Sequence, residues 1–230
     1  MYPNCHSMSQ ISFKLHISEG AGAVTCEIIE ADKPIAILAL AHGAGAGMHH
    51  SFMLQLAAAL ASSRISTIRF NFPYMEQGKK RPDTPKIAQE TIYRVILETH
   101  HRYPALPIYA GGKSFGGRMT SQLAAFRQLA ELKGLVFFGF PLHPPGKPSV
   151  QRADHLQQVP IPMLFLQGTR DKLATPELMK QTTEHLDKSK LIFLDGADHS
   201  FQMLKSSGRS QQEVFNALAS LTAKWVMQNK

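Results

Sequence analysis

Gly112-Lys113-Ser114-Phe115-Gly116 follows directly on the run Pro107-Ile108-Tyr109-Ala110, and a segment typical of a helix comes after it. A serine hydroxyl is a weak nucleophile unless the backbone lifts it toward a base, and a sharp turn from strand to helix does this. Small residues on both sides of the serine relieve the crowding in such a turn. Gly112 and Gly116 occupy these two positions, so the sequence predicts that Ser114 is a nucleophile at the end of a strand.

The same residues allow two other interpretations. Gly112-Lys113-Ser114 matches the end of a phosphate-binding loop, but that loop needs a glycine five residues before Gly112, where this chain has Pro107. The phosphate loop is therefore disfavoured. A tight glycine turn with an incidental serine stays open on these residues alone.

Partners for this serine follow later in the chain, in the order acid and then histidine, each after a predicted strand. Residues 163–167 are predicted as a buried strand, and Asp171 follows it. Residues 190–194 are predicted as another strand, and His199 follows that one. An imidazole takes a serine proton near neutral pH, and a carboxylate fixes the tautomer of the ring. We therefore expect Ser114, Asp171 and His199 to form a catalytic triad.

Each partner also has a simpler interpretation. Asp171 could cap the helix that starts near Thr175 or pair with Arg170, and Asp195 and Asp198 compete with it for the acid role. Asp198 adjoins the histidine in the chain, so we expect its carboxylate to point elsewhere. His199 is one of 11 histidines, and a lone histidine in a loop is usually part of the polar surface. The ordered set favours the joint interpretation over any single member.

A second glycine-rich stretch, His42-Gly43-Ala44-Gly45-Ala46-Gly47, follows the apolar run 35–41. Acyl transfer needs N–H donors for the oxyanion that develops in the transition state. We expect the backbone N–H groups of Ala44 and Phe115 to supply them. The rival interpretation, a dinucleotide-binding fingerprint, lacks its third glycine in either frame. A flexible turn remains a further alternative.

Length and composition favour one domain over residues 1–230, because 43% hydrophobic residues in 230 can fill a large core. Two cysteines, Cys5 and Cys26, provide no disulfide framework and suggest a reducing compartment. Residues 1–10 lack an apolar signal region, and no apolar run is long enough to span a bilayer. These features predict a cytoplasmic protein without a membrane partner.

The net charge of +8 permits acidic partners without demonstrating them. The one basic cluster, Lys79-Lys80-Arg81, is interpreted as a solvated loop, with a rim that attracts anionic substrates as the alternative. No zinc-finger or RNA-binding signature accompanies the basic residues, so no nucleic-acid partner is expected. The pattern contains neither H-E-x-x-H nor C-x-x-C, so neither a metal nor another cofactor is expected.

Strand and helix patterns alternate along the chain, which predicts a mainly parallel sheet with helices on both faces. Residues 11–17 and 24–29 flank a glycine turn and are expected to form an antiparallel pair. The other predicted strands are residues 35–41, 67–72, 107–110, 135–140, 163–167 and 190–194. The predicted helices are residues 52–61, with Ser51 as N-cap, and 85–103, 117–129, 176–186 and 211–227. Only the proline-rich residues 141–162 could cover the site, so a minimal lid or none is expected.

The chain resembles the α/β-hydrolase-like proteins grouped with the testis-expressed hydrolase-like protein and a subunit of the non-specific-lethal histone acetyltransferase complex. The resemblance rests on segments spread over most of the chain. These are residues 41–50, Arg69-Phe70-Asn71-Phe72-Pro73-Tyr74, residues 112–118, Pro141-Leu142-His143-Pro144-Pro145-Gly146-Lys147 and residues 197–201. It implies the α/β-hydrolase fold and supports Ser114, Asp171 and His199 as triad positions. It implies no substrate, because the group contains a scaffold component as well as hydrolases.

Two classes of function follow. The favoured one is a serine hydrolase that acts through an acyl-enzyme on small-molecule esters, thioesters or amides. The alternative is a catalytically weak or inactive protein that binds or scaffolds with the same fold. The complete, ordered triad favours the enzyme, while the acyl group, the leaving group and the oligomeric state stay open.

Overall fold

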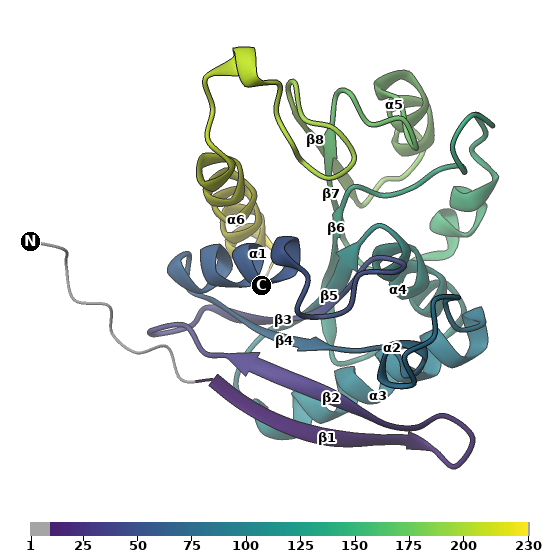
Figure 1. The fold of residues 1–230 in the computed structure, drawn as a ribbon, viewed down its shortest axis with the longest axis vertical. Helices are drawn as coiled ribbons and strands as arrows, with labels where there is room; N and C mark the ends of the chain where they lie inside the picture. Colours follow the sequence, from purple (N-terminus) through teal and green to yellow (C-terminus); the bar gives the residue numbers. More distant parts are fainter. Residues whose placement is uncertain (1–9, 230) are drawn as a thin grey trace, which may run out of the picture.

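A computed structural model describes residues 10–229, and its eight strands form one sheet in the order β1-β2-β4-β3-β5-β6-β7-β8 (Figure 1). β1 pairs antiparallel with β2, β2 pairs antiparallel with β4, and the remaining neighbours are parallel. The predicted sheet, mainly parallel with an antiparallel N-terminal pair, is confirmed. The strands are β1 (Gln10–Ser18), β2 (Gly22–Ile29), β3 (Ala36–Ala41), β4 (Ile65–Phe70), β5 (Ile108–Lys113), β6 (Leu132–Phe138), β7 (Met163–Gly168) and β8 (Ser189–Leu194).

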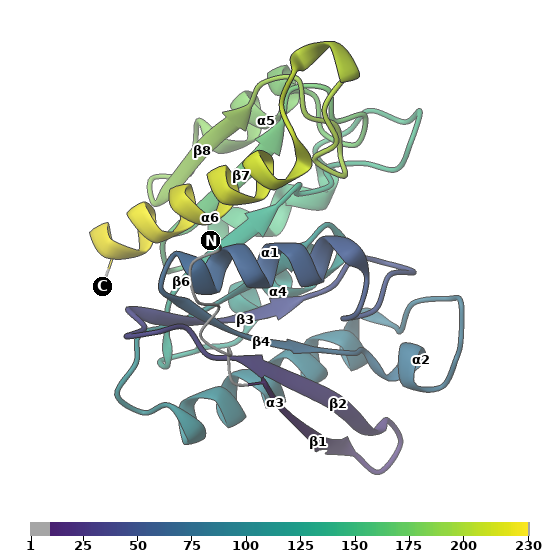
Figure 2. The ribbon, with the colours of Figure 1, turned by 60° about the vertical axis from the view of Figure 1, so that its left-hand side comes forward.

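Helices cover both faces of this sheet, as predicted (Figure 2). α1 (Ser51–Ser62) and α6 (Gln211–Gln228) pack together on one face, where Leu56 and Phe215 belong to one buried cluster. The other face carries α3 (Pro85–Arg102), α4 (Phe115–Phe126) and α5 (Pro176–Thr183). Every residue of β3, β4, β5 and β7 is buried, since parallel strands between two helical layers have no solvent face.

Several predicted boundaries shift in the structure. The strand predicted at 67–72 runs over Ile65–Phe70, because the chain leaves the sheet before Pro73, which begins the short helix α2 (Pro73–Glu76). The elbow helix begins at Phe115 and not at residue 117. Ser51 as N-cap of α1 is wrong: His50 holds that position, and its Nδ1 accepts the N–H of Phe52 at 3.2 Å.

The segment between β6 and β7 is short. It contains one 3₁₀ helix, η1 (Gln151–Gln158), which packs on α4, and no multi-helix cap. A second 3₁₀ turn, η2 (Lys205–Ser207), follows β8. The expectation of a minimal lid is therefore confirmed, and the carboxyl ends of the parallel strands stay accessible.

Two expectations concern cysteines and membranes. Cys5 and most of the N-terminal segment predicted to lack a signal region lie outside the described residues. Cys26 is a buried free cysteine, and burial, the largest effect, raises the pKa of its thiol to about 12. None of the helices in residues 10–229 combines the length and apolarity needed to cross a bilayer. Cellular location stays a prediction.

Candidate active site

The turn around Ser114 needs glycine on both sides, because the elbow helix packs directly on the end of β3. A Cβ on Gly112 would lie 2.2 Å from the carbonyl oxygen of Ala41, and one on Gly116 would lie 2.6 Å from the same oxygen. Ser114 itself has φ 50° and ψ −112°, a conformation that residues other than glycine rarely adopt. The turn therefore presents the Ser114 hydroxyl at the carboxyl edge of the sheet, and the local strain is held by close packing.

Three side chains predicted to act together form a continuous hydrogen-bonded chain. Ser114 Oγ lies 2.9 Å from His199 Nε2, and His199 Nδ1 lies 2.7 Å from Asp171 Oδ2. The Asp171 carboxylate is fully buried, whereas the His199 ring is 23% exposed. Because an ionised carboxylate only accepts hydrogen bonds, Nδ1 carries the proton and Nε2 is free to accept from the serine.

The orientation of Asp171 depends on two donors that were not predicted. Gln167 Nε2 donates to Asp171 Oδ2 at 2.6 Å, and the Leu173 N–H donates to Oδ1 at 2.8 Å. Gln167 is itself oriented, since its Oε1 accepts the N–H of Phe140 at 2.9 Å. Gln167 lies near the end of a buried strand, just before the loop that carries Asp171, and this position was the only sequence signal for its role. A polar residue in an otherwise apolar strand needs a partner.

The competing carboxylates serve local structure. Asp198 Oδ1 accepts the N–H groups of Ser200 and Gln202, at 2.8 and 2.9 Å, and so stabilises the turn that carries His199. Asp195 Oδ1 accepts the Thr169 hydroxyl at 3.1 Å. Asp171 is also not the cap of α5, because the Thr175 side chain caps that helix.

A second serine–histidine contact lies within the core. Ser121 Oγ is 2.7 Å from His155 Nε2, and both residues are buried between α4 and η1. Burial, with a smaller contribution from Arg118, lowers the pKa of His155 to about 4, although Asp154 opposes the shift. None of the described carboxylates forms an ion pair with His155. The pair therefore joins two helices and does not present a nucleophile to solvent.

The two predicted oxyanion donors come from different elements: Ala44 lies on the loop after β3, and Phe115 is the first residue of α4. Ala44 lines the same pocket as Ser114 and His199, whereas Phe115 is not among the lining residues. Within residues 10–229 the N–H groups of Ala44 and Phe115 find no acceptor in a turn, loop or side chain. Free N–H groups next to a serine hydroxyl are what an oxyanion hole requires. Their role stays a prediction.

The loop that carries Ala44 is held by the segment after β4. The Phe72 N–H donates to His42 Nε2 at 3.2 Å, and the Gly45 N–H donates to the Tyr74 hydroxyl at 3.0 Å. Burial, the largest effect, lowers the pKa of His42 to about 4, so the ring is neutral and Nε2 can accept. The loop after β3 is thus fixed by the segment after β4, and these two strands are neighbours in the sheet.

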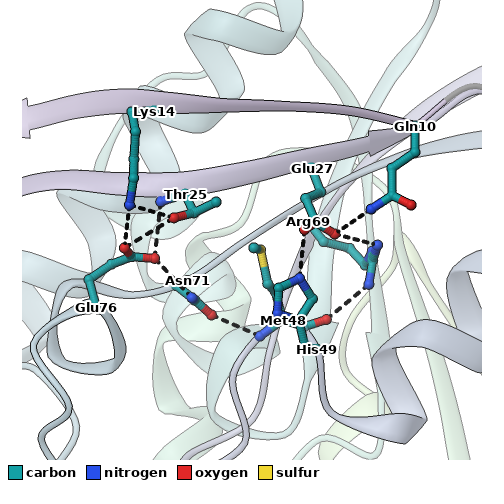
Figure 3. Close-up of polar contacts among 9 residues, drawn as sticks. All are labelled: Gln10, Lys14, Thr25, Glu27, Met48, His49, Arg69, Asn71 and Glu76. Carbon is teal, nitrogen blue, oxygen red and sulfur yellow. Dashed lines mark hydrogen bonds and ion pairs between the residues drawn. The ribbon is translucent and has the colours of Figure 1, made fainter.

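Polar side chains hold the end of this loop at Met48 (Figure 3). Asn71 Oδ1 accepts the Met48 N–H at 2.9 Å, and Arg69 Nη1 donates to the Met48 carbonyl at 3.0 Å. Glu27 pairs with buried Arg69 at 3.0 Å, and Glu76 accepts from Asn71 Nδ2 at 2.8 Å. Side chains of the Arg69–Asn71 segment therefore hold both the N–H and the carbonyl of Met48. No sequence pattern had assigned this segment to the site.

The pocket at Ser114 has a volume of about 390 Å³. Apolar side chains of α1 and α6, the two helices on one face of the sheet, line one part of the pocket: Phe52, Met53 and Phe215. Polar side chains also line it: His50, Ser51, Gln55, Ser200, Gln202 and Gln211. Lys113 also lines this pocket, whereas no aspartate or glutamate does. No group of three His, Cys, Asp or Glu residues within the described residues could hold a metal ion.

Comparison with known proteins identifies the family and the fold. Residues 34–227 match the model of a family described as an alpha/beta hydrolase domain. A dienelactone hydrolase from Anabaena variabilis superposes with a TM-score of 0.76 at 17% identity, covering 97% of this chain and 99% of that one. An α/β serine hydrolase without a lid from Xanthomonas campestris gives 0.71 at 20% identity, covering 97% and 98%. At these identities the two structures establish the fold they share with this chain.

Proposed function

The chain belongs to the family of alpha/beta hydrolase domains, and from this premise we propose that it is a serine hydrolase acting through an acyl-enzyme. The observation that carries the proposal is the hydrogen-bonded chain from Asp171 through His199 to Ser114 at the floor of a pocket. That chain has the connectivity by which a buried carboxylate and an imidazole activate a serine.

The geometry supports one role for each group. Ser114 Oγ attacks the acyl carbon, and His199 Nε2 takes the hydroxyl proton and then gives it to the leaving group. Asp171 holds the ring tautomer and stabilises the imidazolium that forms. The N–H groups of Ala44 and Phe115 would stabilise the oxyanion. Water activated by His199 then cleaves the acyl-enzyme and restores the free serine.

The pocket favours small ester or thioester substrates. Its volume of about 390 Å³ is near the lower end of common ligand pockets, which hold roughly 300–1,000 Å³. Phe52 and Phe215 provide an apolar wall for the acyl group, and the amide side chains at the rim can hydrogen-bond a polar leaving group. A short connection between β6 and β7 leaves the site open to solvent and unsuited to sequestering a long lipid chain.

Within the family, we propose that the chain belongs to the group that contains the testis-expressed hydrolase-like protein and the subunit of the non-specific-lethal complex. This finer assignment rests on residues 69–74 and 141–147, and the contacts of the first segment explain its importance for the site. Asn71 and Tyr74 hold the loop that carries Ala44.

The test of the proposed function is hydrolysis of p-nitrophenyl esters from acetate to decanoate, combined with labelling by a fluorophosphonate. We expect turnover to be greatest for short acyl chains and to fall for long ones, because the pocket is small and has no lid. A wild-type protein that neither hydrolyses any ester of the series nor reacts with the phosphonate would instead support a binding or scaffold role.

A further inference from the structure

Lys113 precedes Ser114 in the chain and lines the same pocket as Ser114 and His199. It is 9% exposed, and its ammonium donates a hydrogen bond to the main-chain carbonyl of His199. Nζ lies 5.6 Å from the ring centre of Phe52 and 5.4 Å from that of Phe201. The side chain therefore connects the elbow at the end of β5 to the loop that carries the histidine.

The space for this ammonium is left by a glycine. Gly139, which follows β6, has φ 70°, and a Cβ there would lie 2.8 Å from Lys113 Nζ. Three segments from different parts of the chain, namely the elbow, the turn after β6 and the histidine loop, thus meet around one amine.

No described carboxylate forms an ion pair with Lys113. Burial, the largest effect, lowers the pKa of Lys113 to about 8, and the charges of Asp171 and Asp198 oppose this shift. A buried cation with one hydrogen bond destabilises the fold relative to an apolar side chain of similar length. Stability alone therefore does not explain a lysine here.

We propose that Lys113 is a positioning residue that holds the backbone of His199, so that the imidazole stays over Ser114, and that keeps a positive charge close to that ring. The proposal rests on the proposed function for its kinetic consequences. The charged and titratable groups around it are Asp171 and Asp198, from the acid and histidine loops, and His199 itself. Two cation–ring contacts stabilise the ammonium without neutralising it.

The test compares the full chain with Lys113→Met, which keeps the length of the side chain and removes the charge and the hydrogen bond. We expect kcat to fall about tenfold, because loss of an orienting contact loosens a catalytic group, while KM stays within about twofold. The acidic limb of the kcat/KM profile should move to higher pH by about half a unit or more, because a nearby cation is gone. The melting temperature should stay equal or rise.

Lys172→Met is the matched control, since Lys172 is exposed on the acid loop and its replacement removes the same charge. It should leave kcat and the pH profile unchanged. A Lys113→Met variant with wild-type kcat and an unmoved acidic limb would overturn the proposal. So would one that raises only KM, or one whose melting temperature falls by several degrees, which would make the lysine structural.

One readout does not need turnover. NMR titration of the His199 ring protons in Lys113→Met should show protonation at higher pH than in the wild type, and amides of residues 198–202 should exchange faster. These two changes are expected even in a protein that hydrolyses no ester. The two failures are distinguishable. If the proposed function is wrong, the wild type itself hydrolyses no ester. If the lysine proposal is wrong, the His199 ring titrates in Lys113→Met as it does in the wild type.

Discussion

His199 Nε2 and Ser114 Oγ lie 2.9 Å apart, although 85 residues separate them along the chain. β5 and β8 end at the same edge of the sheet because they, and the two strands between them, are parallel. Loops that follow parallel strands meet at the carboxyl edge, and this edge is where open α/β sheets bind ligands. Asp171 lies on the loop after β7, a strand between β5 and β8, and completes the hydrogen-bonded chain.

Ser114→Ala should abolish labelling by a serine-directed phosphonate and lower ester hydrolysis by several orders of magnitude, because the attacking oxygen is lost. Mass spectrometry of the labelled peptide and ester assays measure the two effects. Ser121→Ala is the matched control, since Ser121 makes the only other serine–histidine contact that the described residues contain. Labelling that survives Ser114→Ala and disappears in Ser121→Ala would show that the wrong serine was chosen.

Asp171→Asn should lower kcat by about 10⁴-fold while the fold persists, because an amide at this position favours the wrong imidazole tautomer. Steady-state kinetics and circular dichroism check this. Asp198→Asn should have a mild effect, since its carboxylate accepts only main-chain N–H groups in the histidine loop. If Asp171→Asn lowered kcat only slightly and Asp198→Asn lowered it severely, Asp198 would be the acid of the triad.

A crystal structure with a phosphonate on Ser114 should place its oxygen about 2.7–3.1 Å from the backbone nitrogens of both Ala44 and Phe115. Backbone donors cannot be removed by ordinary substitution, so the distances themselves are the measurement. An oxygen that contacts Phe115 and a nitrogen other than that of Ala44 would refute the Ala44 assignment and leave the triad intact.

Tyr74→Phe should lower kcat several-fold with a smaller change in KM, because the Gly45 N–H loses its 3.0 Å acceptor and the loop that carries Ala44, the predicted oxyanion donor, is held less firmly. The free energy of unfolding should fall by about 1 kcal/mol, the usual contribution of one hydrogen bond. Tyr103→Phe removes a comparable hydroxyl contact, to Glu30, away from the site and is the control. Equal kcat losses in both variants would exclude a specific role for Tyr74.

Glu76→Gln should remove part of the acid dependence of stability. Burial raises the pKa of Glu76, but hydrogen bonds from Lys14, Asn71 and Thr25 outweigh burial and lower it to about 2. A group with a lowered folded-state pKa stabilises the protein above its unfolded value, near 4.5, and this contribution disappears as the pH falls toward 2. The melting temperatures of the wild type and Glu76→Gln should therefore differ most at pH 6 and draw closer as the pH falls from about 4.5 toward 2. Glu184→Gln, at an exposed glutamate, should show no such convergence.

Sequence reasoning succeeded where the signal was local. The glycines around Ser114, the apolar runs and the order of Asp171 and His199 after predicted strands all depend on near neighbours in the chain. It failed at Ser51, because the cap of α1 depends on the backbone conformation at His50, whose ring reaches the Phe52 N–H. The boundary at Phe72 was also missed, since an apolar residue after a strand continues the pattern although the chain has left the sheet.

The sequence by itself determined the fold class, the alternation of strands and helices and the residues predicted for the triad, because apolar periodicity and glycine spacing report local conformation. Only the tertiary structure decided which groups support them: Gln167 behind Asp171, Asn71 and Tyr74 against the loop that carries Ala44, and Lys113 against the carbonyl of His199. These contacts join strands and loops far apart in the chain. Their partners follow from the order in which the strands pair, and hydrogen bonds across a sheet leave no periodic trace in the sequence.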